Sequence, residues 1–217
     1  MSNNTVIFGD SYSTFKNFIP DGYETYYSEN GCPAPDVTDV TQVNQTWWYQ
    51  VITETNLNLV LNNSWSGSTI SYTGYNNTDC SKSSSFIYRL HMLIKQGFFD
   101  RNRIDTVFVF GGTNDSWANA PLGISKYENW KCNDLYSVLP AISYFFKTLR
   151  DTLPKAQIYC LINTGLKTEI STEMKKACQL YGIIEISFDT IDKNCGHPTI
   201  IGMNEIKNTV IHTLRNN

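Results

Sequence analysis

The sequence predicts an α/β fold in which a five-stranded parallel sheet is covered by helices on both faces. Short apolar runs alternate with stretches of helical periodicity along the 217 residues, and strands separated by helices are joined by right-handed crossovers that make them parallel. The run 106–110 is almost continuously apolar, as expected of a strand buried on both faces. Polar residues follow several of these runs, which places them together at the carboxyl edge of the sheet.

Each predicted strand is a short apolar run bounded by turn residues. The first is 6–13, the stretch VIFGDSYS, whose apolar part breaks at Gly9. The other strands are expected at 57–61, 106–110, 157–162 and 183–188.

The predicted helices repeat apolar residues at helical spacing. Thr46 is a plausible N-cap for the first of them, and Gly97 and Gly182 are plausible C-caps for the second and fourth. The helices are expected at 47–55, 86–96, 135–149, 169–181 and 200–214.

The whole chain, residues 1–217, is predicted to form one domain. Its hydrophobic content of 41% can build a substantial core, and no stretch is long and polar enough to divide two domains. A long aromatic loop at about 15–46 interrupts the alternation of strands and helices. Loops of this length are commonly lids or walls of binding sites, and a surface excursion packed by its own tyrosines is the alternative.

Composition argues against several classes of partner and site. The formal net charge is −3 and no run of lysine or arginine occurs, so no nucleic acid partner is expected. No apolar stretch approaches the roughly twenty residues that span a bilayer, so no transmembrane segment is expected. The six cysteines are scattered without a C-x-x-C pair, which predicts neither a zinc site nor a disulfide framework.

The start of the chain, MSNNTVIF, lacks a basic segment followed by a long apolar one. Together with the cysteine pattern, this favours a cytoplasmic location over a secreted one. A leader peptide removed from the natural protein would change that expectation, so localisation stays unknown, as does the oligomeric state.

Three turns after predicted strands carry candidate catalytic groups. Ser11 follows the first strand, where a hydroxyl pushed out of the sheet can be reached by a base. Gly67 and Asn114 lie in the turns after the second and third strands. The backbone N–H groups of Ser11 and Gly67 and the side-chain amide of Asn114 can together donate to a developing oxyanion.

His197 is the candidate base. Of the three histidines it alone lies beyond a predicted strand, in the loop before the last helix. Pro198 restricts His197 to extended backbone and can start that helix, so the imidazole projects from a defined position. A serine whose proton is taken by such an imidazole is the arrangement that acyl transfer needs.

Four short blocks resemble those of a known family. They are Gly9-Asp10-Ser11, the turn ending in Gly67, Gly112-x-Asn114-Asp115 and His197-Pro198. Their order and positions after strands are similar to the SGNH hydrolases, also called the GDSL esterase/lipase family, and they span almost the whole chain. The resemblance implies a flavodoxin-like three-layer α/β/α sandwich without metal or organic cofactor. It also implies Ser11 as nucleophile, Ser11, Gly67 and Asn114 as oxyanion donors, and His197 as base.

One position departs from the family pattern. The family usually has an aspartate three residues before its histidine, where this chain has Asn194, and an amide does not stabilise an imidazolium as a carboxylate does. Asp192 is the nearest carboxylate and Asp189 is the next. We favour Asp192, carried into place by a bulged loop, over a serine–histidine dyad oriented by Asn194 or by a backbone carbonyl.

The predicted activity is that of a serine esterase that hydrolyses a carboxylic ester through an acyl-serine intermediate. A short acyl group is expected because no long apolar lid segment is evident, and the substrate is a small-molecule or glycan ester, with an O-acetylated carbohydrate as one form. Aromatic residues near a cleft can stack on sugar rings, although they also fit acyl chains. The alternatives are a lipase or thioesterase for longer acyl chains, and a catalytically impaired relative that binds carbohydrate.

Overall fold

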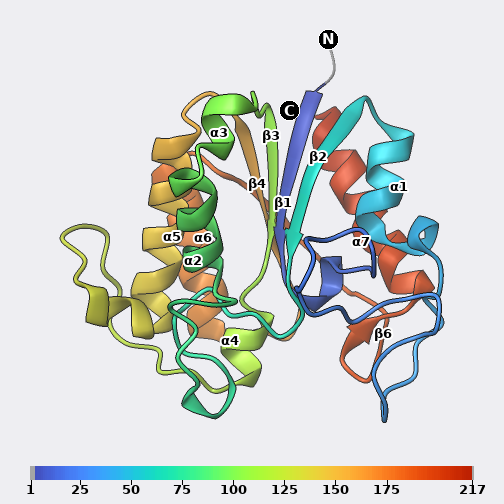
Figure 1. Cartoon of the computed structure of the whole chain (residues 1–217), viewed down its shortest axis with the longest axis horizontal. Coiled ribbons are helices and arrows are strands. Elements are labelled where there is room, and N and C mark those ends of the chain that lie inside the picture. Colours follow the sequence, from blue (N-terminus) through green and yellow to red (C-terminus); the bar gives the residue numbers. More distant parts are fainter. Residues whose placement is uncertain (1–2, 217) are drawn as a thin grey trace.

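The central sheet of the protein is parallel and five-stranded. A computed structural model describes residues 3–216, and the strand order is β2-β1-β3-β4-β5 (Figure 1). This is the flavodoxin-like order of a doubly wound sheet, so the fold class expected from the sequence is confirmed. The strands are β1 (Asn3–Gly9), β2 (Leu57–Ser64), β3 (Thr106–Phe110), β4 (Gln157–Ile162) and β5 (Ile184–Ser187).

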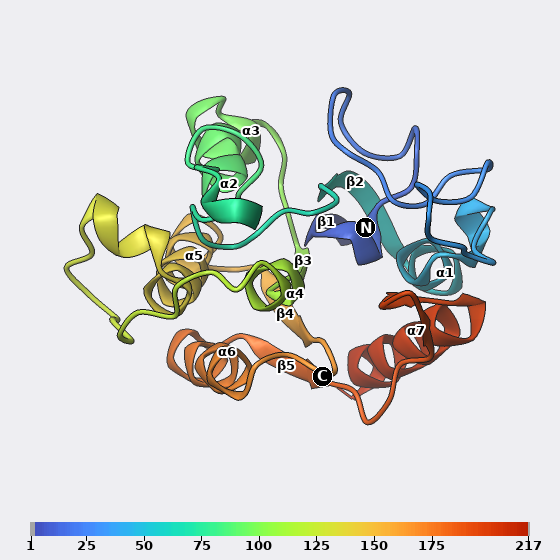
Figure 2. The same ribbon diagram turned by 90° about the horizontal axis from the view of Figure 1, so that it is seen from below.

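Helices cover both faces of the sheet and complete three layers, as Figure 2 shows from below. Alternate side chains of β3 explain this arrangement, because Val107 packs with the helices of one face and Phe108 with those of the other. One face carries α2 (Phe86–Lys95), α5 (Val138–Thr152) and α6 (Thr168–Tyr181), and the other carries α1 (Trp47–Glu54) and α7 (Ile200–Arg215).

The sequence pattern does not predict three short elements, which are α3 (Phe98–Arg101), α4 (Thr113–Trp117) and the hairpin of β6 (Lys193–Asn194) with β7 (His197–Pro198). Each is too short for an apolar repeat to be recognised. Together with the turns after β1 and β2, α4 and β6 gather at the lower edge of the sheet in Figure 1. This is the carboxyl edge at which the polar residues were expected to meet.

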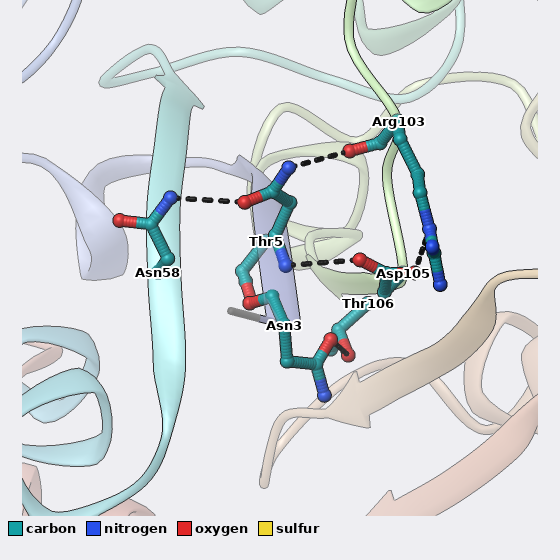
Figure 3. A network of polar contacts seen from close by, with 7 residues as sticks. Asn3, Thr5, Asn58, Arg103, Asp105 and Thr106 are labelled. Carbon is teal, nitrogen blue, oxygen red and sulfur yellow. Dashed lines mark hydrogen bonds and ion pairs between the residues drawn. The ribbon is translucent and has the colours of Figure 1, made fainter. Parts of the chain in front are cut away.

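At the amino-terminal ends of the strands, polar contacts join residues at the starts of β1 and β2 to residues just before β3 (Figure 3). Asn58 Nδ2 of β2 donates to Asn4 Oδ1 of β1 at 2.9 Å, and Asn4 Nδ2 donates to the Arg103 carbonyl oxygen at 2.9 Å. Asp105 accepts from the Asn4 backbone N–H at 3.2 Å and pairs with Arg103 Nε at 2.7 Å. These contacts fix the starts of the strands and leave the carboxyl edge to present the functional groups.

The long segment 15–46 packs beside α1 and against the loop before α7. Tyr26 and Tyr27 are buried within it, and the Tyr27 hydroxyl donates to the Pro198 carbonyl oxygen at 2.9 Å. The segment is therefore packed by its own tyrosines and also contacts the loop that carries His197. Among residues 3–216, no helix is both long and apolar enough to span a membrane.

Candidate active site

Ser11 stands at the point where β1 ends in a tight turn. A Cβ atom on Gly9 would lie 2.4 Å from Ser64 Oγ and 2.6 Å from Ser13 Cβ, so only glycine allows the chain to turn so close to its neighbours. The carboxylate of Asp10 accepts from the Tyr12 N–H at 3.1 Å and caps the 3-10 turn Ser11–Ser13. This local structure presents the Ser11 hydroxyl at the carboxyl edge of the sheet.

His197 lies beside Ser11 with both ring nitrogens engaged. Its Nε2 is 2.9 Å from Ser11 Oγ, and its Nδ1 is 3.2 Å from the carbonyl oxygen of Cys195. A carbonyl oxygen only accepts hydrogen bonds, so the contact assigns the ring proton to Nδ1. The lone pair of Nε2 then faces the Ser11 hydroxyl, which is the geometry of a general base and its nucleophile.

Two buried tyrosines hold the loop that carries His197. The Tyr12 hydroxyl donates to the Gly196 carbonyl oxygen, and the Tyr27 hydroxyl donates to the Pro198 carbonyl oxygen. Cys195 has a φ of 48° and Gly196 a φ of 78°, and these left-handed residues form the turn of the β6–β7 hairpin. The turn brings the Cys195 carbonyl back toward the ring of His197.

The structure does not place Asp192 at His197, which corrects the preferred assignment of the orienting group. The Asp192 carboxylate accepts from the Thr199 hydroxyl at the start of α7, where Thr199 is the N-cap. Asn194 Nδ2 donates to the Val37 carbonyl oxygen at 2.9 Å, and Asp189 is exposed. The arrangement seen is the alternative in which a backbone carbonyl, that of Cys195, orients the histidine.

The three expected oxyanion donors come from three different strand ends. Among residues 3–216, the N–H groups of Ser11 and Gly67 donate to no other protein group, so both are available to a ligand. Gly67 has a φ of 77°, a backbone conformation that residues other than glycine rarely adopt. Asn114 is buried in the first turn of α4, and its amide can supply the third donor.

The amide of Asn114 is held in one orientation. Its Nδ2 donates to the Ser68 carbonyl oxygen at 3.0 Å, and its Oδ1 accepts from the Tyr75 hydroxyl at 2.8 Å. An amide NH₂ group has two hydrogens, and within residues 3–216 only one hydrogen bond from Nδ2 occurs. Asp115 fixes the same region, because its carboxylate accepts from the N–H of Ile70 at 2.8 Å and of Ser71 at 3.1 Å.

Replacing Tyr75 by phenylalanine should weaken catalysis while leaving substrate binding nearly intact. The hydrogen bond to Asn114 Oδ1 is neutral and contributes about 0.5–1.5 kcal/mol, so we expect kcat to fall about 2- to 10-fold with KM little changed. Steady-state kinetics with p-nitrophenyl acetate measures both constants. Tyr136→Phe is the matched control, because the Tyr136 hydroxyl is bonded to Asp79 at 3.2 Å instead of to Asn114. Equal rates for Tyr75→Phe and the unchanged protein would contradict the orienting role.

Burial dominates the electrostatics of His197. It lowers the pKa of the imidazole below the ordinary value, whereas the Cys195 carbonyl and the charge of Asp36 raise the pKa and Lys193 lowers it. The net direction is downward, so the base is neutral near pH 7 and ready to accept a proton. Burial also raises the pKa of Asp10 to about 7.

Aromatic contacts of His197 are the part of the site that the sequence pattern does not reveal. The ring of Tyr26 is stacked on the imidazole, with centroids 3.5 Å apart and planes 11° apart. The ring of Trp117 stands edge-on at 5.6 Å, and that of Tyr12 is tilted at 5.6 Å. The density of aromatic residues in 15–46 was a signal for a wall of the site, but no spacing rule links Tyr26 to His197.

The chain is similar to known proteins over nearly its whole length. Residues 3–214 match the family described as GDSL-like lipase/acylhydrolase. A crystal structure of a candidate GDSL-like lipase from Bacteroides ovatus is 41% identical, with a TM-score of 0.90 over 100% of both chains. A second one, from Bacteroides uniformis, is 40% identical, with a TM-score of 0.89 over 100% of this chain and 97% of that one. No curated protein matches the chain.

The family match covers nearly the whole chain and includes all four blocks that surround Ser11 and His197. In residues 3–216, no three His, Cys, Asp or Glu side chains are grouped so that they could hold a metal ion. The chain belongs to the GDSL-like lipase/acylhydrolase family and is a hydrolase of the SGNH/GDSL type.

Proposed function

We propose that the protein is a serine esterase that removes a short acyl group from a carbohydrate through an acyl-Ser11 intermediate. The observation that carries this proposal is the 2.9 Å contact between Ser11 Oγ and His197 Nε2. A nucleophile, a base with a defined tautomer and an oxyanion site are the parts that acyl transfer needs.

The reaction begins when His197 Nε2 takes the Ser11 proton as Oγ attacks the ester carbonyl. The carbonyl oxygen becomes an oxyanion that faces the N–H groups of Ser11 and Gly67 and the amide of Asn114. His197 then gives its proton to the leaving alcohol, which leaves the acyl group on Ser11. Water enters, loses a proton to Nε2 and attacks the acyl carbonyl, and the proton returns to Ser11 Oγ as the acid leaves.

Exposed aromatic rings near the catalytic pair support a carbohydrate as the alcohol part of the ester. Trp117 is 43% exposed and Tyr75 is 40% exposed, although one ring contacts His197 and the other is bonded to Asn114. Tyr23 and Trp65 are half-buried and pack on each other with ring centroids 4.2 Å apart. Flat, fixed rings at such positions can stack on the faces of pyranose rings.

Some carbohydrate esterases have the same fold as this chain. A family two carbohydrate esterase from Clostridium thermocellum, in complex with cellohexaose, has a TM-score of 0.63 and 14% identity to this chain. The match covers 99% of this chain and 64% of that one. The likeness is one of fold, and the sugar preference proposed here therefore depends on the aromatic rings around Ser11.

The acyl length and the sugar preference can be tested separately. We expect kcat/KM to be highest for p-nitrophenyl acetate and to fall as the acyl chain of the p-nitrophenyl ester lengthens. A rise with chain length would instead identify a lipase or thioesterase. Quenching the reaction early and analysing the peptides by mass spectrometry should place the acetyl group on Ser11.

Trp117→Ala should distinguish a sugar-binding ring from one that only packs. Loss of one stacking ring costs about 0.5–1.5 kcal/mol beyond its buried area. We therefore expect KM for an acetylated cello-oligosaccharide to rise about 3- to 10-fold, with KM for p-nitrophenyl acetate within about twofold. Loss of the contact between Trp117 and His197 would act on kcat for both esters alike. Phe18→Ala is a matched control, because Phe18 is also 43% exposed but packs on Trp48 and Tyr49. An equal KM effect on both esters would count against sugar stacking at Trp117.

A further inference from the structure

We propose that Asp36, acting through the hydroxyl of Tyr26, stabilises the imidazolium of His197 and so replaces the carboxylate that this chain lacks at position 194. Neither side chain touches the reacting atoms, so both are positioning residues. The inference rests on the proposed function, because it concerns the base that serves Ser11.

The structure connects Asp36 to His197 through one aromatic ring. The Tyr26 hydroxyl donates to Asp36 Oδ2 at 2.9 Å, and the Tyr26 ring lies parallel to the imidazole at 3.5 Å. The Tyr26 N–H donates to Thr14 Oγ1 at 2.9 Å, and the Tyr27 ring packs against Tyr26 at 4.9 Å. These contacts fix the ring in place, so the stack is part of the folded site.

Asn194 links the segment that carries Asp36 to the segment that carries His197. Its amide donates to the carbonyl oxygen of Val37, the residue after Asp36, and Asn194 pairs with His197 across the small hairpin. The Asp36 N–H also donates to the Pro33 carbonyl oxygen at 3.2 Å. The residue at the usual aspartate position thus holds a different carboxylate near the histidine.

A carboxylate-bonded phenol favours the charged form of a stacked imidazole over the neutral form. The face of an aromatic ring is electronegative, and a cation over that face is attracted to it. The hydrogen bond from the Tyr26 hydroxyl to the Asp36 carboxylate shifts electron density into the phenol ring. This shift strengthens the attraction between the ring and the imidazolium. Since His197 is neutral before the reaction and charged in the transition state, the added stabilisation acts on the rate.

The two charged groups near His197 shift the pKa of its imidazole in opposite directions. Asp36 raises the pKa of His197, and Lys193 lowers it. Lys193 Nζ donates to Asn163 Oδ1 at 3.0 Å and lies 5.5 Å from the Tyr12 ring centroid. Burial, followed by the bond to Asp36 and the neighbouring Cys32 thiol, raises the pKa of the Tyr26 phenol. Burial likewise raises the pKa of Tyr12, so both phenols keep their protons across the working range of the base.

Asp36→Asn and Tyr26→Phe test the connection by different changes. Asp36→Asn removes the negative charge that polarises the Tyr26 phenol, and Tyr26→Phe removes the hydroxyl itself. Both variants keep an aromatic ring at position 26. We expect kcat for p-nitrophenyl acetate to fall about 5- to 30-fold, less than the roughly four orders of magnitude lost when a directly bonded triad carboxylate becomes an amide. The double variant should lose little more than either single variant, because both changes remove the same interaction.

The pH profile separates this role from a structural one. Removing the negative charge destabilises the imidazolium, so the acid limb of kcat/KM should move to lower pH in Asp36→Asn. The ratio of wild-type to variant rates should therefore shrink as pH falls through the limb. A loop that was merely loosened would lower the rate without moving the limb. Asp21→Asn is the control, because Asp21 lies in an exposed part of the same segment. It should change neither kcat nor the position of the acid limb.

Two results would overturn the inference. One is an acid limb that stays in place in both Asp36→Asn and Tyr26→Phe, and the other is losses that simply multiply in the double variant. Circular dichroism shows whether each variant folds, and if Asp36→Asn does not, Tyr26→Phe decides because it keeps the stacked ring. Full activity in Ser11→Ala would instead reject the proposed function, so the two failures can be told apart.

Discussion

Ser11→Ala is expected to lower kcat for p-nitrophenyl acetate by about four orders of magnitude or more, and His197→Ala by a comparable factor. Either change removes one member of the pair joined by the 2.9 Å contact between Oγ and Nε2, so the nucleophile is lost in one variant and its base in the other. The residual rate would come from the oxyanion donors and from substrate binding alone. Because the two groups act as one unit, the double variant should be no slower than either single one.

The measurement needs a comparison that separates catalysis from folding. Ser11→Ala removes one oxygen from a side chain in a tight turn and should leave the circular dichroism spectrum and Tm unchanged. Asp192→Asn is the informative companion, because its carboxylate bonds Thr199 and not His197. We expect it to lower kcat less than about tenfold, far below the roughly 10⁴-fold loss expected of a triad aspartate. A loss as large as that of His197→Ala would restore Asp192 to the orienting role.

The positions of Ser11, Gly67, Asn114 and His197 could be predicted because each follows a strand whose apolar pattern is clear. Parallel strands end at one edge, so the order of the blocks placed Ser11, Gly67, Asn114 and His197 together without knowledge of any contact. The preference for Asp192 was wrong, because the group in contact with His197 Nδ1 is the backbone carbonyl of Cys195. The direction of this carbonyl depends on the left-handed turn at Cys195 and Gly196. The number of residues between His197 and the nearest carboxylate does not predict that direction.

The path of the segment 15–46 is a second feature that could not be predicted from the sequence. Its length and its tyrosines predicted either a wall of the site or a self-packed excursion, and the structure combines the two. Tyr27 is buried in the core under α1 and α7, whereas Tyr26 is stacked on His197. Which tyrosine meets the histidine depends on how the segment folds back, and no periodic pattern encodes an irregular path.

Arg89→Ala is expected to destabilise the fold by about 3–5 kcal/mol, because it removes a buried side chain and leaves its hydrogen-bond partners unpaired. Arg89 is 1% exposed, and its guanidinium carbon lies 4.4 Å from the Phe86 ring centroid. Arg89 donates to the Gly9 carbonyl oxygen at 3.2 Å, Asn63 Oδ1 at 2.9 Å, Ser68 Oγ at 3.1 Å and the Ser84 carbonyl oxygen at 2.8 Å, and also to the Asn63 carbonyl oxygen. These acceptors lie at the ends of β1 and β2, in the turn after β2 and just before α2.

Unfolding in urea and thermal melting measure this loss. For a domain of this size each kcal/mol shifts Tm by about 2–4 °C, so Tm should fall by about 6–20 °C. Arg101→Ala is the matched control, because Arg101 is exposed and surface changes cost less than about 0.5 kcal/mol. Arg89→Met restores much of the volume without the donors, so it separates packing from hydrogen bonding. If Arg89→Met is as stable as the unchanged protein, the bonds that join the ends of β1 and β2 contribute little. The packing of the Arg89 side chain, which includes its contact with the Phe86 ring, would then account for its contribution.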